Sequence, residues 1–293
     1  MTLNIIFVIL YFIFAPLLGG LFAGLDRVVS ARMQGRVGPP VFQPFYDVFK
    51  LLGKQNFTVN RFHSYYLVCY LLFAVLNGAQ LYLACLFNAD DILFVIFTLT
   101  LADIFLVMAA YSAGSPYSFI GAERELFQML VAEPLLLITA FGFYMATKSF
   151  DVVKIYSADH MLFLSLPGIF IGFVFVLTIK FRKSPFDLAT SHHAHQELVK
   201  GLTTEFSGPT LALFEIAHWF EVVMLLGIVF LFFASSPLLG LIITVLTYFA
   251  TILIDNTYAR FKLHLTFEVA WIATLILGGG NLMVLYFLKL VNG

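Results

Sequence analysis

Long apolar stretches alternate with short polar segments along most of this chain. A helix needs about 20 predominantly apolar residues to cross the roughly 30 Å hydrocarbon layer of a bilayer. Eight stretches meet this requirement, at approximately 3–25, 64–87, 92–114, 126–147, 161–181, 211–234, 238–254 and 267–289. The pattern predicts an all-α integral membrane protein, a bundle of about eight transmembrane helices in one polytopic domain over residues 1–293.

The polar positions gather in four loops that such a bundle places on one side of the membrane. These predicted loops are 26–63, 115–125, 182–210 and 255–266. Of the 16 Lys and Arg residues, all but Lys148, Lys154 and Lys289 lie in these loops or, like Lys180, beside them. Because basic residues concentrate in cytoplasmic loops, we expect these long loops to be cytoplasmic and both termini to be outside.

The first of these loops also has a helical pattern of its own. Apolar side chains recur at helical spacing at Phe42, Phe45, Phe49 and Leu52. The charged residues Asp47, Lys50 and Lys54 occupy other faces of the same segment. Such a segment is typical of an amphipathic helix lying in the membrane interface, and a plain surface anchor is one reading of it.

Composition agrees with a membrane protein and excludes several classes. The chain is 61% hydrophobic and 11% charged, whereas soluble domains carry about 45–50% apolar and about 25% charged residues. A net charge of −1 gives no excess of cations for phosphates, which argues against a nucleic-acid partner. Cys69 and Cys85 lack the further ligands that a zinc or iron–sulfur site requires, so we expect no metal site from them.

Acidic residues inside the apolar stretches are the first candidates for chemistry. There are five: Asp103, Glu133, Glu215, Glu221 and Glu268. A charge at the bilayer centre costs at least ~2.5–3.5 kcal/mol, so such groups face the bundle interior, pair, or carry a proton. In "FEIAHWFEVV", Glu215, His218 and Glu221 share an arc of about 120° on a helix. This spacing suits a proton relay or a hydrogen-bonded packing cluster, whereas Glu268, near a span end, is better read as a surface acid.

A histidine cluster, "SHHAHQELVKG", lies in the third long loop. It contains His192, His193 and His195, followed by Glu197. His192 and His195 can share a helix face and bind a metal, but no further ligands stand at a fitting spacing and no HExxH motif is present. Polar packing against a partner is the preferred reading.

Several loop motifs, in order, resemble the proximal membrane subunit shared by respiratory complex I and the membrane-bound [NiFe] hydrogenases. They are "DRVVSARMQGRVGPP", "QPFYDVFKLLGK", "GAERELFQMLVAEP", "SPFDL", "ELVKG" and "TEFSG". The resemblance implies a surface for a soluble arm and coupling loops at Gln34, Arg36, Asp47, Lys50, Arg124, Asp187, His192, His193, His195, Glu197 and Glu205. The buried acids and His218 are the candidate path for H⁺ or Na⁺: Asp103, Glu133, Glu215, His218 and Glu221. The resemblance matches Glu133 to a family position, whereas the family often has an acid where this chain has His218.

Two departures distinguish this chain from complex I. "GPPVFQP" is shorter than the corresponding connection of complex I, beside the quinone chamber, which argues against quinone binding. "ATSHHAHQ" replaces an acidic stretch and is similar to the energy-converting hydrogenases, of which the Ech type is the nearest resemblance.

The resemblance therefore implies a membrane anchor and ion-translocation coupling subunit of a ferredoxin-linked, hydrogen-evolving [NiFe] hydrogenase in a prokaryotic cytoplasmic membrane. No cofactor is expected in this chain. The [NiFe] centre and [4Fe-4S] clusters would belong to the large and small hydrogenase subunits and a ferredoxin-like iron–sulfur subunit, beside an antiporter-like membrane subunit. The alternatives are a quinone-site subunit of a complex I-like enzyme, a free-standing transporter or channel, and a purely structural anchor.

Overall fold

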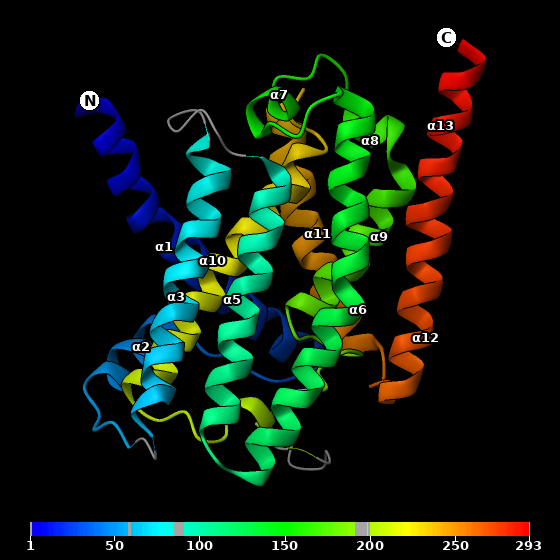
Figure 1. Ribbon diagram of the computed structural model, residues 1–293. Helices are drawn as coiled ribbons and strands as arrows, with labels where there is room; N and C mark the ends of the chain where they lie inside the picture. The colour runs from blue at the N-terminus through cyan, green and yellow to red at the C-terminus, as the bar shows by residue number, and fades with distance from the viewer. Residues whose placement is uncertain (1, 58–59, 85–90, 191–197, 199, 293) are drawn as a thin grey trace.

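The computed structural model describes residues 2–57, 60–84, 91–190, 198 and 200–292. Within these residues the chain forms helices and no strand, which confirms the all-α prediction. Seven helices are long and apolar enough to cross a membrane. Both termini lie at the same end of the bundle (Figure 1), which fits eight crossings if the shorter apolar helix Pro167–Lys180 is added to these seven. The single-domain organisation and the outside placement of the termini stay predictions.

The helices follow the predicted spans, with differences at their ends. They are α1 (Thr2–Met33), α2 (Gln43–Leu52), α3 (Arg61–Tyr82), α5 (Ile92–Ser112), α6 (Pro116–Thr147), α7 (Val152–Tyr156), α8 (Leu162–Ser165), α9 (Pro167–Lys180), α10 (Pro209–Leu231), α11 (Pro237–Thr257), α12 (Leu263–Ala273) and α13 (Gly280–Asn292). A short 3₁₀ turn spans Gly201–Thr203, and a π-helical segment, Thr274–Gly279, joins α12 to α13.

Proline residues mark where several of these helices begin. Pro116, Pro167, Pro209 and Pro237 each stand in the first helical turn, where the missing N–H has no partner to lose. The prediction of a loop at 115–125 was wrong, because α6 starts at Pro116 and this segment forms its first turns. The loop 26–63 likewise begins later than predicted, since α1 continues to Met33.

The fifth predicted span, 161–181, is divided. α8 ends at Ser165, and α9 begins at Pro167 and has 14 residues. A residue before proline avoids the helical region, and Leu166 accordingly has φ −123° and ψ 38°. The crossing at this place is therefore shorter than the sequence pattern suggests.

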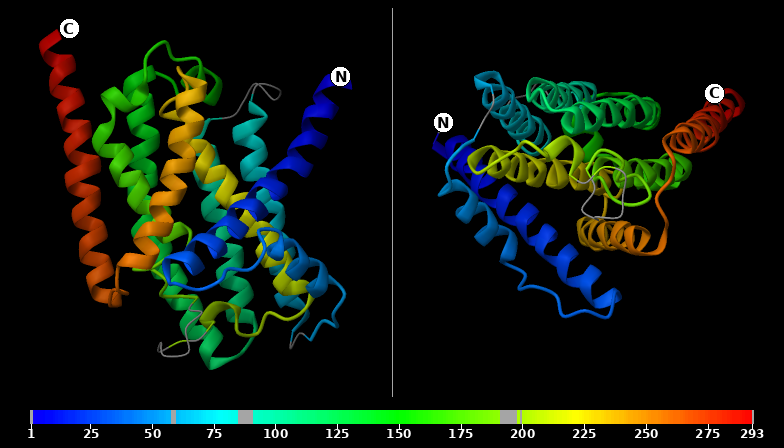
Figure 2. Two further views of the ribbon diagram at one scale, coloured as in Figure 1. Left: turned by 180° about the vertical axis from the view of Figure 1, so that it is seen from behind. Right: turned by 90° about the horizontal axis from the view of Figure 1, so that it is seen from below.

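α10 is the central helix of the bundle. It contacts α1, α2, α3 and α11, and 72% of its most apolar window is buried, against 11% for the window in Leu263–Leu288. α1 crosses the bundle obliquely beside α10 and α11, whereas α12 and α13 stand at one edge (Figure 2). Side chains on α10 can thus meet groups from both sides of the bundle.

The end opposite to the two termini carries α2 and most of the polar connections (Figure 1). We call it the loop end; it includes residues 34–42, 53–57 and 181–190. The predicted amphipathic helix is found as α2, whose Phe49 side chain is 70% exposed while Val48 is buried. Its place in the membrane interface stays a prediction. An exposed aromatic face beside a buried one is typical of a helix lying on a membrane surface.

Candidate functional site

Two buried cations near the loop end connect α5, α6 and α10. They are Lys180, the last residue of α9, and Arg182, just after it. Lys180 forms an ion pair with Asp103 of α5. The guanidinium of Arg182 lies 2.7 Å from Glu125 of α6 and 3.8 Å from Glu221 of α10. All five side chains are at most 9% exposed. We call this set, together with His218 and Tyr70, the charged cluster.

Arg182 owes its position to the way α9 ends. The Arg182 N–H donates to Ile179 O and the Lys183 N–H donates to Thr178 O, with Arg182 at φ 52°. This is a Schellman ending, whose left-handed position usually belongs to glycine. Burial opposes the charge of Arg182, but Glu125 and Glu221 outweigh it and raise the pKa of the guanidinium. The chain thus accepts backbone strain to hold a permanent cation here.

Glu221 is the most highly connected acid of the charged cluster. Its Oε2 accepts a hydrogen bond from the Tyr70 hydroxyl at 3.0 Å. The Nδ1 atom of His218 lies 3.3 Å from the same oxygen and 3.2 Å from Arg182 Nη1. The predicted neighbourhood of His218 and Glu221 is thereby found in the structure.

Each of the three acids keeps one buried oxygen without a hydrogen-bond partner. These atoms are Asp103 Oδ1, Glu125 Oε2 and Glu221 Oε1. Buried polar atoms are normally satisfied by protein or by ordered water. The arrangement can therefore take up water or a proton at three neighbouring carboxylates.

A second group of polar contacts, beside the charged cluster, begins at Lys183. Lys183 Nζ lies 2.9 Å from Asp26 of α1 and 4.9 Å from the centre of the Tyr248 ring of α11. The Ser184 N–H donates to Asp255 Oδ1 at 2.8 Å. Lys183 and Ser184 thus reach acids on the two neighbouring helices α1 and α11, and both acids line one cavity.

A cavity of about 460 Å³ lies between the charged cluster and the contacts of Lys183. Its walls come from α1, α10, α11 and the segment after α9: Gly19, Ala23, Asp26, Arg27, Phe181, Arg182, Lys183, Glu215, His218, Trp219, Val222, Tyr248 and Asp255. Glu215 lines this cavity and makes no ion pair within the described residues. Of the predicted trio on α10, only His218 and Glu221 touch; Glu215 faces the cavity.

The remaining predicted acids differ in their surroundings. Asp103 belongs to the charged cluster through Lys180. Glu133 is half-buried on α6 with Oε1 lacking a hydrogen-bond partner, and no hydrogen bond or ion pair joins it to the charged cluster in the described part of the chain. Glu268 is exposed beside His264, at 3.6 Å, as a surface acid should be.

The residues expected to meet a soluble arm lie at the loop end wherever the structure describes them. Gln34, Arg36, Asp47, Lys50, Arg124, Asp187 and Glu205 are each exposed or partly exposed there. Asp187 pairs with Arg260 at 3.4 Å, and Arg124 donates to Leu188 O at 3.4 Å. His192, His193, His195 and Glu197 lie outside the described residues, and their roles stay predictions.

Asp47 of α2 accepts hydrogen bonds from Arg27 of α1 and from Gln43, the first residue of α2. Burial by itself would raise its pKa, but hydrogen bonds from Arg27 and Gln43 lower it below its ordinary value. The Arg27 contact is 2.6 Å and the Gln43 contact 2.9 Å. The ion pair between Arg27 and Asp47 joins α1 to α2.

The sequence pattern does not indicate several residues of the site. Lys180 and Arg182 resemble ordinary loop-side cations in the sequence, and no spacing pattern marks Glu125 or Tyr70. The available signal was the run "KFRKSPFD", in which three cations follow directly on an apolar helix. In the described residues no group of three or more His, Cys, Asp or Glu side chains is placed to hold a metal.

Fold and site together define a polytopic helical membrane protein with a buried charged cluster near one end. Residues 4–286 match the profile of the NADH dehydrogenase family, and the chain belongs to that family. This confirms the shared family inferred from the loop motifs.

Individual relatives cover nearly the full chain. Formate hydrogenlyase subunit 4 of Escherichia coli is 28% identical over 288 residues, covering 89% of this chain and 91% of that protein. Hydrogenase-4 component C of Escherichia coli is also 28% identical, with 92% of both chains covered. A subunit of the NADH-quinone oxidoreductase of Carboxydothermus hydrogenoformans is 29% identical over 213 residues, 66% of this chain and 59% of that protein.

Among solved structures, a chain of the archaeal membrane-bound sulfane sulfur reductase, a respiratory membrane complex, superposes with a TM-score of 0.83. The match covers 96% of this chain and 99% of the other at 24% identity, and it establishes a shared fold. The chain is thus a membrane subunit of the kind found in multisubunit oxidoreductases.

Proposed function

We propose that this chain is the membrane anchor and ion-translocation coupling subunit of an energy-converting, ferredoxin-linked [NiFe] hydrogenase that evolves hydrogen. Electrons stay in partner subunits, the large and small hydrogenase subunits and a ferredoxin-like subunit, which carry the [NiFe] centre and [4Fe-4S] clusters. The loop end faces the cytoplasm and those partners. The similarity to formate hydrogenlyase subunit 4 and hydrogenase-4 component C over about nine-tenths of the chain supports this assignment.

The charge balance of the charged cluster is the observation on which the proposal rests. Two permanent cations, Lys180 and Arg182, face three buried carboxylates. An uncompensated buried charge is too costly to persist, so it binds a proton or pairs. The cluster therefore holds one exchangeable proton, shared among the carboxylates and His218, and this proton is the species to be moved.

The coupling element is the segment that begins at Phe181. Its Arg182 lies nearer to Glu125 than to Glu221, at 2.7 against 3.8 Å. A displacement of about 1 Å would exchange which carboxylate the guanidinium neutralises, and the other would then take the proton. Because this segment runs from the cluster to the loop end, a redox event in a docked partner can bias the two arrangements, which is what coupling between sites requires.

Purification of the tagged chain in mild detergent, with its partners, tests the proposal. The expected complex contains nickel and iron and evolves hydrogen from reduced ferredoxin. A nickel-free complex that reduces a quinone would contradict it. A chain that is monomeric and transports ions without partners would also contradict it, and would make the protein a free-standing transporter.

One observation favours a quinone-site subunit as the second candidate. The cavity of about 460 Å³ combines Phe181, Trp219 and Tyr248 with charged groups such as Arg182, a lining suited to an aromatic ring with polar oxygens. Titration of the purified complex with a short-chain quinone distinguishes the candidates. Saturable quinone reduction, abolished by Trp219→Ala, is expected only if quinone binds there.

A further inference from the structure

α2 presents three different faces at the loop end. Pro44 and Val48 are buried against the bundle. A second face carries aromatic side chains that are 58%, 62% and 70% exposed: Phe42, Tyr46 and Phe49. Aromatic residues of this kind settle at the headgroup level of a membrane. This aromatic face suits α2 to a membrane surface, and its third face is directed to the space between α1 and α10.

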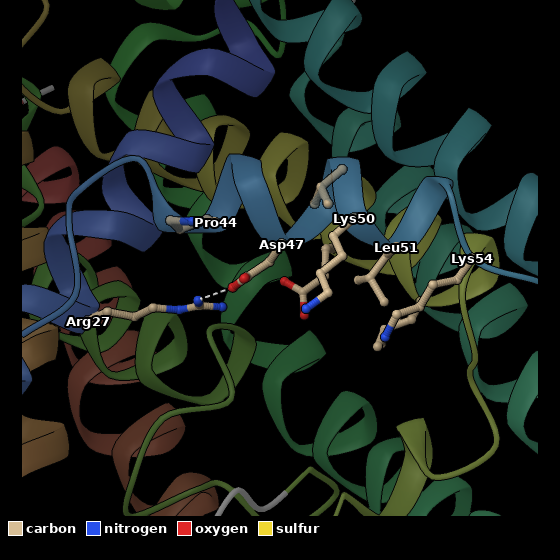
Figure 3. Close-up of a pocket in the computed structure, with 9 residues that line it drawn as sticks. Arg27, Pro44, Asp47, Lys50, Leu51 and Lys54 are labelled. Atoms are coloured by element: carbon tan, nitrogen blue, oxygen red, sulfur yellow. Dashed lines mark hydrogen bonds and ion pairs between the residues drawn. The ribbon is translucent and has the colours of Figure 1, made fainter.

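The third face is charged and covers a cavity of its own. Asp47 and Lys50 leave α2 on one side, and Lys54 follows just after the last residue of the helix. Asp47 meets Arg27 of α1 (Figure 3). The cavity measures about 310 Å³ and is completed by Leu211 and Glu215 of α10 and by Leu51. Ligand sites range over about 300–1,000 Å³, so this one suits a headgroup or another small polar group.

The charges around this cavity do not balance. Arg27 and Asp47 neutralise each other across 2.6 Å. Lys50 and Lys54 form no ion pair with a described residue, and Glu215 is the one remaining acid among the lining residues. Two lysines thus face a single carboxylate, which leaves the walls with a surplus of one positive charge. A monoanion complements such a site.

From this geometry we propose that the cavity binds the phosphodiester headgroup of an anionic phospholipid, with its phosphate between Lys50 and Lys54. The lipid source follows from position, because the cavity opens beside an interfacial helix and basic pockets at membrane surfaces attract anionic headgroups. The aromatic face of α2 and the exposed Leu52 supply an apolar edge for the acyl chains. The lipid fixes α2 against α1 and α10, whatever reaction the partner subunits perform.

Native mass spectrometry of the purified complex tests this site directly. The complex is exchanged into detergent and loaded with dioleoyl phosphatidylglycerol, with dioleoyl phosphatidylcholine as the neutral comparison. The variant Lys50→Gln/Lys54→Gln removes both cations, and Lys50→Arg/Lys54→Arg keeps them. Lys200→Gln/Lys262→Gln is the matched control, since both of these lysines are exposed and neither lines the cavity.

The expected result is one retained phosphatidylglycerol in the parent chain, bound about 30-fold more weakly in the Lys50→Gln/Lys54→Gln variant. The arginine variant and the control retain it. Equal retention in the glutamine variant, or an equal loss in the control, overturns the proposal. Release of the lipid by an excess of inorganic phosphate would assign the site to free phosphate instead and would also overturn it. If the double glutamine variant does not assemble, Lys54→Gln alone, with about a fivefold loss expected, gives the same decision.

Discussion

Replacing Arg182 by glycine has two opposite effects on stability. It relieves backbone strain, and it removes the cation that pairs with two buried acids. Arg182 stands in the left-handed region at φ 52°, where glycine is favoured. Lys148 provides a matched position, because it ends α6 with φ 58° and its side chain is exposed. The variants Arg182→Gly and Lys148→Gly therefore make the same backbone change with and without the loss of buried ion pairs.

The expected sizes follow from the contacts. Relief of the left-handed strain stabilises each variant by about 1–2 kcal/mol, and the greater freedom of glycine in the unfolded chain removes about 0.5–1 kcal/mol of that gain. Arg182→Gly additionally leaves Glu125 and Glu221 without their cation at 2.7 and 3.8 Å. Breaking a buried pair costs about 3–5 kcal/mol, so the two variants should differ by about that amount.

Thermal unfolding of the detergent-solubilised chain, followed by light scattering, measures this difference. At about 2–4 °C per kcal/mol, Arg182→Gly should unfold roughly 6–20 °C below Lys148→Gly. Lys148→Gly itself should equal or slightly exceed the parent chain. If both variants gain stability equally, the Arg182 side chain holds no buried acids and the description of the charged cluster is wrong.

Three further changes test separate contacts. Lys180→Leu strands Asp103 and should cost about 3–5 kcal/mol in thermal unfolding, most of which Asp103→Asn in the same chain should restore; an equally unstable double variant would contradict the pair. Tyr70→Phe removes the hydroxyl donor to Glu221 and should cost about 1 kcal/mol, and a larger loss would point to a role beyond this hydrogen bond. Asp47 has a lowered pKa in the folded chain, so its contribution is present above a pH of about 4 and is lost as the pH falls. Unfolding midpoints between pH 3 and 6 should therefore fall less steeply for Asp47→Asn than for the parent chain, and parallel curves would refute this.

The sequence was sufficient for the bundle because each membrane span is a local property. Long apolar stretches specify a helix wherever they occur in lipid, and each of the seven long helices overlaps one predicted span. The ends were less predictable. α6 begins well before its apolar run because "GAERELFQ" continues the helix that Pro116 starts, and the division before Pro167 depends on a single residue.

The charged cluster was only partly predictable. His218 and Glu221 share a helix face at i, i+3, so their contact follows from local spacing. The partner of Asp103 is Lys180, 77 positions away, and no local pattern pairs such residues. Arg182 lies beyond the end of α9, so helical periodicity does not predict which way its side chain points. A buried cation and an exposed loop cation therefore look alike in the sequence.

The central claim is that the charged cluster carries the ion moved by the complex. The most direct measurement is ion uptake per hydrogen evolved by the purified complex in proteoliposomes, for the parent chain, Glu221→Gln and the exposed-acid control Glu268→Gln. We expect Glu221→Gln to evolve hydrogen from reduced ferredoxin with little or no ion uptake, while Glu268→Gln matches the parent. An unchanged uptake ratio in a fully assembled Glu221→Gln complex would contradict it, and the cluster would then serve only to hold the bundle together.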